Sequence, residues 1–388
     1  MYKNIGVISM ARTAVGSFGG SLKGFQAYDL AAMAVKEAVS RSNLSPDRID
    51  EVLMGCVGQY GLNVFLGRMA GQNAGLPHET TGQTINRMCA SGLQAIASGA
   101  DYISSGHGSV VVAGGAESMS NYPYSLSGAR WGLKMGDGQL KDDLLNALTE
   151  PFTGTHIAIT VENIAKKYGI SREEADQYAL ESQDKATKAI AGGKFQEEIF
   201  PVEIVDRKST TIFEVDEYPR ATSLEKLGKL RTAFDKEGVI TAGNASGIND
   251  GAAAVVLADV DKVEEEPLAY FLDYAVAGVD PNYMGMGPVF AVRKLMKRTG
   301  LSLNDVGLFE MNEAFAVQAL ACVRELDIDP AKVNVNGGAI SLGHPIGASG
   351  AFVSIKLINE MRRQKVRYGI AGLCIGGGQG LAALFEVK

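Results

Sequence analysis

Apolar residues recur along the chain at two spacings, which predict an alternation of strands and helices. Short apolar runs at residues 5–8, 51–57 and 109–115 predict buried strands. Between them, residues 28–41 and 93–103 carry apolar side chains every three or four positions, the spacing of a helix with one buried face. Strands that alternate with helices indicate a mostly parallel sheet covered by helices on its faces.

The pattern changes between residues 119 and 247. Aromatic, glycine and charged residues are mixed there, and helical spacing is strong only over residues 157–167 and 171–191. Ser171 followed by Glu174 is the signature of a capping box, which predicts the start of the second of these helices. This segment is therefore predicted to be an inserted, largely helical and irregular domain that builds a binding cleft.

The last third of the chain repeats the first part in outline. Ala348-Ser349-Gly350 has the same sequence as Ala90-Ser91-Gly92, and each triplet opens a predicted helix that leads to a strand and a glycine cluster. The matching order of elements favours an internal duplication. The expected elements are a strand at 270–276, a helix at 289–298, a strand ending at Glu310, helices from Glu313 and near Ser349, and a last strand at 370–373.

These patterns divide the chain into three parts. Residues 1–118 and 248–268 are predicted to form an N-terminal half, and residues 269–388 a similar C-terminal half. Residues 119–247 are predicted to form the inserted domain. The charged link at residues 259–267 is the clearest boundary.

Composition excludes several classes of protein. The 388 residues carry a net charge of −7, which argues against a nucleic acid or an anionic membrane as the main partner. No apolar run reaches the roughly 18 residues that a membrane-spanning helix needs. The four Cys do not form a disulfide scaffold and the four His show no zinc spacing, so we expect no metal site. A strand predicted at residues 5–8, where a leader would lie, leads us to expect a cytoplasmic protein.

Cys89 is the first candidate for chemistry. It lies at or just before the N-terminus of the helix predicted at 93–103, where free N–H groups and the helix dipole stabilise negative charge. The thiolate is the nucleophilic form of Cys, and such positions lower the pKa of a thiol. The alternative is a buried Cys that only packs, which is our interpretation of Cys56 inside the run at 51–57.

Three later segments are candidates to meet Cys89. Asn312 follows a predicted strand and presents either an amide to a substrate or an ordinary helix cap. His344 stands between Gly and Pro in a glycine-rich loop, where its imidazole either does chemistry or holds the loop. Cys374 ends a predicted strand and is followed by Gly376, Gly377 and Gly378, whose consecutive amides suit an oxyanion hole. A second thiol at that place is a candidate general base.

Taken together, these segments resemble the thiolase family. The resemblance is carried by Cys89-Ala90-Ser91-Gly92, Asn312-Glu313-Ala314-Phe315, Gly343-His344-Pro345 and Cys374-Ile375-Gly376-Gly377-Gly378, in this order. It extends from Ala11-Arg12-Thr13 to the C-terminus. It implies an α/β thiolase fold, with two duplicated βαβαβαββ halves in a five-layered α-β-α-β-α arrangement and an inserted loop domain.

The resemblance also implies roles for the site residues. Cys89 would attack the thioester of an acyl-CoA and carry the acyl group. His344 would activate Cys89 and, with a water held by Asn312, stabilise the thioester oxygen of the incoming substrate. Cys374 would remove or return the proton on the α-carbon. The amides of Cys89 and Gly376 would form a second oxyanion hole.

Coenzyme A and acyl-CoA would be substrates, and no permanently bound cofactor is expected. His156 and Ser246 match the family's pantetheine-contacting segments, and Arg220 its contact near the nucleotide end. Each of these three could instead be an ordinary surface or loop residue. The family also pairs subunits through sheet edges, which implies a homodimer or a homotetramer.

The expected reaction is condensation of two acetyl-CoA to acetoacetyl-CoA plus CoA, and the reverse thiolysis, since the segment from His344 to Ser349 resembles biosynthetic thiolases. The alternative is a degradative 3-ketoacyl-CoA thiolase of fatty-acid β-oxidation with a longer acyl pocket. A non-catalytic acyl-CoA or lipid-binding relative, and a carrier-dependent ketosynthase, are disfavoured because both sulfurs are present. Ala14, Ile157 and residues 62–68 depart from the family pattern. These departures leave chain length and assembly open.

Overall fold

The computed structural model describes residues 1–206 and 209–388 of the chain. Its strands are β1 (Ile5–Arg12), β2 (Gly16–Ser17), β3 (Glu51–Gly55), β4 (Thr81–Ile85), β5 (Val110–Ser118), β6 (Tyr124–Leu126), β7 (Leu140–Asp142), β8 (Val202–Val205), β9 (Thr210–Phe213), β10 (Asn249–Asp259), β11 (Ala269–Gly278), β12 (Leu308–Met311), β13 (Tyr368–Ile375) and β14 (Gln379–Glu386). Its helices are α1 (Ala27–Arg41), α2 (Leu66–Asn73), α3 (Ser91–Ser104), α4 (Asp143–Ala147), α5 (Ile157–Tyr168), α6 (Arg172–Ala191), α7 (Leu224–Gly228), α8 (Gly287–Thr299), α9 (Ala316–Leu326), α10 (Ala339–Leu342) and α11 (Ser349–Gln364).

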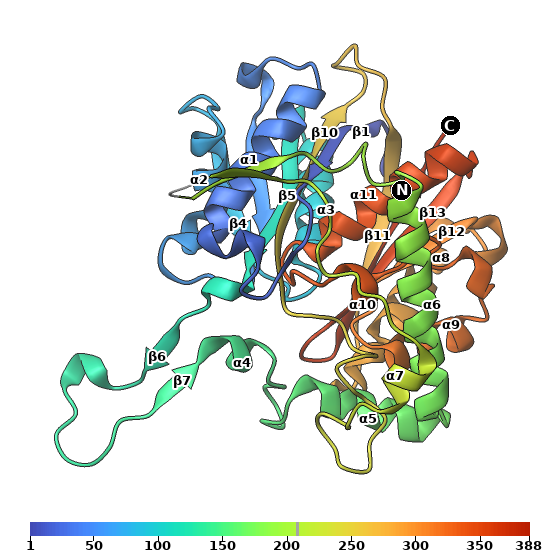
Figure 1. Ribbon diagram of the computed structural model, residues 1–388. Coiled ribbons are helices and arrows are strands. Elements are labelled where there is room, and N and C mark those ends of the chain that lie inside the picture. Colours follow the sequence, from blue (N-terminus) through green and yellow to red (C-terminus); the bar gives the residue numbers. More distant parts are fainter. Residues whose placement is uncertain (207–208) are drawn as a thin grey trace.

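Within these ranges, a 10-stranded sheet runs through the middle of the molecule in the order β12-β13-β14-β11-β1-β10-β5-β3-β4, with β2 beside β10 (Figure 1). The pairs β3–β4, β3–β5 and β12–β13 are parallel, whereas the others are antiparallel. The expectation of a mostly parallel sheet is therefore wrong. The reason is that β10 returns from the insertion against β5, and that β13 turns directly into β14.

Strand order confirms the duplication. The first half has the order β1-β10-β5-β3-β4, and the second half has the order β11-β14-β13-β12. A single parallel bridge between Phe309 and Val333 takes the place that the β3–β4 pair has in the first half. The two halves join where β1 meets β11, through the pairs Gly6–Tyr270 and Val7–Ala269.

Three groups of buried apolar side chains separate the layers. The first lies between helices α1 and α2 and one face of the first half of the sheet. The second is shared by both halves and surrounds α3 and α11, which lie side by side in the interior (Figure 1). The third joins α8 and α9 to the outer face of the second half. This arrangement is the expected α-β-α-β-α stack.

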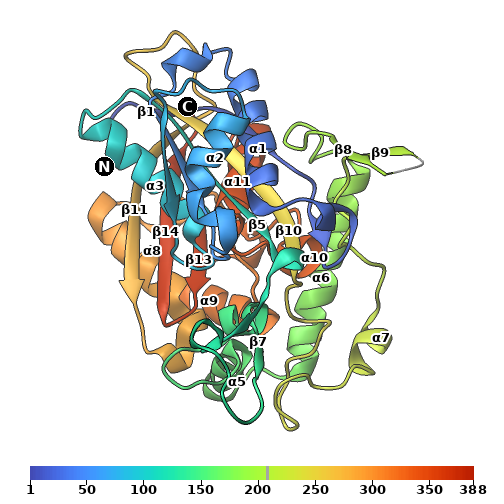
Figure 2. The same ribbon diagram turned by 90° about the vertical axis from the view of Figure 1, so that its left-hand side faces the viewer.

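The segment between β5 and β10 lies largely outside this stack. Its β6–β7 hairpin projects from the body, and it exposes Trp131 and Met135 to 83% and 100%. Figure 2 shows α6 and the β8–β9 ribbon together on one side of the molecule. The predicted capping box at the start of α6 is confirmed, since the N–H of Ser171 donates to Glu174 at 2.8 Å and the N–H of Glu174 to Ser171 at 3.2 Å.

Candidate active site

The predicted site residues converge on one cavity of about 460 Å³. Cys89, His344 and Cys374 line it. His156, Arg220 and Ser246 line the same cavity. Asn312 is next to it, because its amide Nδ2 lies 3.4 Å from Nε2 of His344. The backbone N–H of Gly376 is close enough to the sulfur of Cys89 to lower the pKa of that thiol.

Cys89 is presented by a tight turn between β4 and α3. Met88 has a φ of 47°, a left-handed conformation that is uncommon for a residue with a side chain and that the surroundings must hold. Ser91 holds it here, since its Oγ accepts from the N–H of Arg87 at 2.9 Å and donates to the carbonyl of Met88 at 2.6 Å. Helix α3 begins at Ser91 with Ala90 as its N-cap, so Cys89 comes just before the helix, as predicted.

The thiol of Cys89 is protonated in the free protein. Burial raises its pKa to about 11, and the N–H of Gly376 acts in the opposite direction without reversing the shift. The net shift is therefore opposite to the expected lowering, because the effect of burial exceeds that of the N–H groups of Gly376 and Cys89. A base close to Cys89 is needed to make it a nucleophile.

His344 presents its ring nitrogen Nε2 to the cavity, beside the amide of Asn312. It lies on the loop between α10 and α11, and its backbone N–H donates to Oδ1 of Asn249 at 2.9 Å. Its Nδ1 is 2.6 Å from Oγ of Ser349, whose hydroxyl donates to the carbonyl of Pro345 at 2.8 Å. Since that hydroxyl proton is already used, we assign the ring proton to Nδ1, which leaves Nε2 as an acceptor. Nδ1 thus holds the loop, and Nε2 remains for chemistry.

Burial lowers the pKa of His344 to about 4, against 6.5 in an unfolded chain. Between these values the unfolded chain binds a proton that the folded protein does not, so folding should lose stability as the pH falls from 6.5 to 4. The shift corresponds to about 3 kcal/mol. We expect the free energy of unfolding, measured by urea denaturation at pH 7 and pH 4, to fall by about that much more in the parent than in His344→Asn. Equal falls in the two proteins would contradict the assignment of a neutral imidazole.

Asn312 is not a helix cap. Helix α9 begins at Ala316 with Phe315 as its N-cap, three residues later than predicted. The N–H of Asn312 instead donates to the carbonyl of Gly372 on β13 at 2.8 Å, which continues the sheet pairing. The side chain is 2% exposed and is directed to His344, so the interpretation as a cap is wrong and the amide remains a site group.

Cys374 ends β13, deep in the cavity. It is 1% exposed, and burial, followed by the charges of Cys89 and Cys322, raises its pKa well above the ordinary value. The turn into β14 needs glycine, because Gly377 and Gly378 have φ values of 82° and 80°. A Cβ on Gly378 would lie 2.6 Å from the carbonyl of Val279. This turn keeps the amide of Gly376 beside the sulfur of Cys89.

The three residues predicted for coenzyme A lie at the walls of the cavity. His156 caps α5, with Nδ1 accepting from the N–H of Ala158 at 3.2 Å, and its ring stacks on Phe234 at 4.3 Å between centroids. Arg220 donates from Nη2 to the carbonyl of Ala242 at 2.7 Å. Sequence reasoning missed Phe234 and Ser349. A stacking partner from a distant loop leaves no local pattern, whereas the five-residue spacing of His344 and Ser349 around a proline could have suggested a pair.

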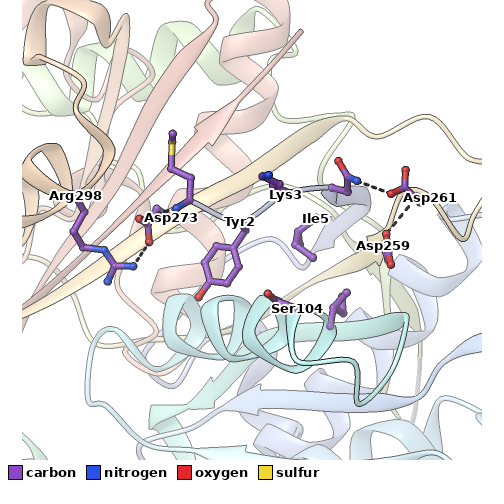
Figure 3. Close-up of a pocket in the computed structure, with 11 residues that line it drawn as sticks. Tyr2, Lys3, Ile5, Ser104, Asp259, Asp261, Asp273 and Arg298 are labelled. Carbon is purple, nitrogen blue, oxygen red and sulfur yellow. Dashed lines mark hydrogen bonds and ion pairs between the residues drawn. The ribbon is translucent and has the colours of Figure 1, made fainter.

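A second cavity, of about 570 Å³, lies at the start of β1 (Figure 3). Its central carboxylate, Asp273, is 1% exposed and lies 2.9 Å from Nη2 of Arg298 and 3.8 Å from the amino group of Met1. Among the described residues that line it there is no cysteine or histidine. It therefore lacks the nucleophile and the base that the first cavity has.

Within residues 1–206 and 209–388, no group of three or more His, Cys, Asp or Glu side chains is arranged to hold a metal ion. None of the helices there combines the length and the apolar character that a membrane span requires.

Two family models match the chain almost end to end. "Thiolase, N-terminal domain" matches residues 5–261, and "Thiolase, C-terminal domain" matches residues 265–387. The chain belongs to the thiolase family. Thiolases of this family are acyltransferases, and so is this protein.

Similar thiolases cover the whole chain. The acetyl-CoA acetyltransferase of Escherichia coli is 49% identical over 390 residues, 99% of each chain. Beta-ketothiolase BktB of Cupriavidus necator is 47% identical over 392 residues, 100% of each chain. The crystal structure of human mitochondrial 3-ketoacyl-CoA thiolase in complex with CoA has a TM-score of 0.95 at 45% identity, and the match covers 99% of this chain and 98% of that one.

Proposed function

We propose that this thiolase is an acyl-CoA C-acetyltransferase, which condenses two acetyl-CoA to acetoacetyl-CoA plus CoA and catalyses the reverse thiolysis through an acyl-Cys89 intermediate. The observation that carries the proposal is the meeting of two thiols, Cys89 and Cys374, with the unprotonated Nε2 of His344 in one cavity. A CoA complex of a relative with the same fold supports an acyl-CoA in this cavity. Residues 119–247 supply its cleft wall as a separate domain.

In the first half of the reaction, Cys89 becomes acetylated. Nε2 of His344 takes the thiol proton, and the sulfur attacks the thioester carbonyl of acetyl-CoA. The imidazolium, together with a water held by Asn312, stabilises the thioester oxygen of the incoming substrate, a role that the 3.4 Å separation of Asn312 Nδ2 and His344 Nε2 supports. The CoA thiolate leaves and takes the proton of Cys374, so that Cys374 becomes a thiolate while His344 is still charged.

In the second half, a carbon–carbon bond forms. The Cys374 thiolate removes a proton from the methyl group of a second acetyl-CoA, and the enolate attacks the carbonyl of acetyl-Cys89. The amides of Cys89 and Gly376 stabilise the tetrahedral oxyanion, each worth about 3 kcal/mol by comparison with donors in other oxyanion holes. The Cys89 sulfur leaves as a thiolate and recovers its proton from His344. The free enzyme is restored, with both thiols protonated.

The second candidate is a degradative 3-ketoacyl-CoA thiolase, the activity named for the human relative. A short acyl group is favoured here because the side chains of Met119, Leu144 and Ile346 pack together against Cys89. We therefore expect faster cleavage, as kcat/KM, of acetoacetyl-CoA than of a long-chain 3-ketoacyl-CoA. A strong preference for the long-chain substrate would reject the first function in favour of the second.

We also propose a homodimer or a homotetramer in the cytoplasm. Strand β4 lies at the edge of the sheet, and the β6–β7 hairpin exposes Trp131 and Met135, which are surfaces that a second subunit can cover. The four free cysteines suit a reducing compartment. Light scattering at micromolar concentration should give at least twice the monomer mass. A monomer under those conditions would refute the assembly.

A further inference from the structure

One buried carboxylate near the site has no role in the reaction described so far. Glu117, near the end of β5, is 0% exposed. Its carboxylate accepts from the N–H groups of Val57 and Gly58, both at 2.9 Å, and of Gly347 at 2.8 Å. The hydroxyl of Tyr122 donates to it at 2.9 Å. The thiol of Cys56 also donates to it, with Sγ 3.6 Å from Oε1. Within the described ranges no Lys, Arg or His pairs with Glu117, so these uncharged donors offset the cost of burying it.

The donors come from three segments that are far apart in the chain. Val57 and Gly58 follow β3, Tyr122 follows β5, and Gly347 lies on the His344 loop, residues 343–350. Each segment also supplies an apolar side chain to the cluster packed against Cys89, namely Val57, Tyr122 and Ile346. The carboxylate therefore ties together the parts of the chain that surround the nucleophile.

The approach of these segments to Glu117 is too close for other residues. A Cβ on Gly347 would lie 2.4 Å from Oε2 of Glu117, and a Cβ on Gly58 would lie 2.3 Å from the ring of Tyr122. A Cβ on Gly115 of β5 would lie 2.3 Å from the carbonyl oxygen of Gly347. Glycines at these positions let three segments close on one carboxylate.

We propose that Glu117 is a positioning residue, which fixes the His344 loop and the wall around the acyl group relative to Cys89. Its charge has a second effect that can be measured, because it raises the pKa of the Cys89 thiol. The other titratable groups that face Glu117 are Cys56, Tyr122 and Tyr60, whose pKa values it also raises. The proposal rests on the proposed function in that Cys89 is taken as the nucleophile.

Glu117→Gln is the direct test, since the side chain keeps its size. Oε1 accepts from Gly58, Tyr122 and the thiol of Cys56, and Oε2 accepts from Val57 and Gly347. Whichever oxygen the NH2 group of glutamine replaces, that group faces a backbone N–H donor. We expect kcat for acetoacetyl-CoA thiolysis to fall about 10²-fold, the size of effect of misplacing groups by about 1 Å, with KM for CoA unchanged. The pH midpoint of Cys89 alkylation by iodoacetamide, read by peptide mass, should move to lower pH.

Glu162→Gln is the matched control. Glu162 is 2% exposed and accepts from the N–H groups of Val239 at 2.9 Å and Ile240 at 3.0 Å, so its loss should destabilise the fold in a similar way. In Glu162→Gln, the pH midpoint of Cys89 alkylation should equal that of the parent. A Glu117→Gln protein with the parent midpoint, and with a fall in kcat no larger than that of Glu162→Gln, would overturn the proposal.

Two further measurements keep the test decisive. If Glu117→Gln does not fold, Tyr122→Phe removes one donor and leaves the charge; a smaller fall in kcat supports the proposal, and parent kcat overturns it. Acetylation of Cys89 in the parent protein by acetyl-CoA tests the proposed function separately. If it fails while the alkylation midpoint still shifts in Glu117→Gln, the proposed function is rejected and the coupling of Glu117 to Cys89 stands.

Discussion

Cys89→Ala should abolish acyl transfer, with a loss in kcat on the order of 10⁶, the size seen when a covalent nucleophile is removed from other enzymes. The variant keeps the cavity, Nε2 of His344 and the amide of Gly376, but no sulfur remains at the point where these groups converge. It should also lose alkylation at a single site by a thiol reagent. Cys374, at 1% exposure, is too buried to replace Cys89 as the target. The measurements are thiolysis of acetoacetyl-CoA and intact-protein mass after alkylation.

Cys56→Ala and Cys322→Ala are the controls for this result. Both thiols are 0% exposed, and burial raises the pKa of each. Both variants should keep the acyl transfer and the alkylation of the parent. If Cys56→Ala alone protected the protein from alkylation, the nucleophile would have to be reassigned.

Cys374→Ser should separate the two halves of the reaction. Acetylation needs a nucleophile, a base and an oxyanion hole, but no proton has to leave carbon. Condensation needs a base beside the α-carbon, which is the role proposed for Cys374. Serine keeps the turn with Gly376, Gly377 and Gly378, but its hydroxyl is a much weaker base than a thiolate. We expect acetylation and CoA exchange to continue slowly, while condensation and α-proton exchange fall by at least about 10².

The two activities of Cys374→Ser have independent measurements. Acetylation of Cys89 adds the mass of an acetyl group to the intact protein, and α-proton exchange brings deuterium into the methyl group of acetyl-CoA. Cys89→Ala is the matched variant, which should lose both. If Cys374→Ser stopped acetylation as completely as Cys89→Ala and left deuterium exchange intact, the two roles would be exchanged.

Features that depend on local sequence were predicted well. Glycines around Cys89, His344 and Cys374 punctuate the chain where strands end and helices begin, and the capping box at Ser171 lies within one turn of a helix. The presence of these helices and strands could therefore be predicted from the spacing of apolar residues, and the order of the site motifs indicated the family.

Features that depend on distant parts of the chain were not predicted. Strand β14 was missed because a three-glycine turn separates it from β13, and the spacing of apolar residues does not indicate a hairpin with that connection. Whether neighbouring strands are parallel or antiparallel depends on how β10 returns to the sheet after the inserted segment. Tertiary packing decides this, and local spacing does not show it. The shift in the pKa of Cys89 was predicted with the wrong sign because burial by distant segments exceeds the effect of the nearby N–H groups. Glu117 was missed because its backbone N–H partners are 59, 60 and 230 residues away.

The shared interior of the two halves bears on whether either half can fold alone. Helix α3 belongs to the first half and α11 to the second, yet Leu93 and Ile96 lie in the same apolar cluster as Ile355 and Ile358, between the two parts of the sheet. A single half on its own would expose that face, with a helix and most of a sheet surface open to water. Each half therefore depends on the other to cover its apolar face, so neither half should fold stably when it is produced alone.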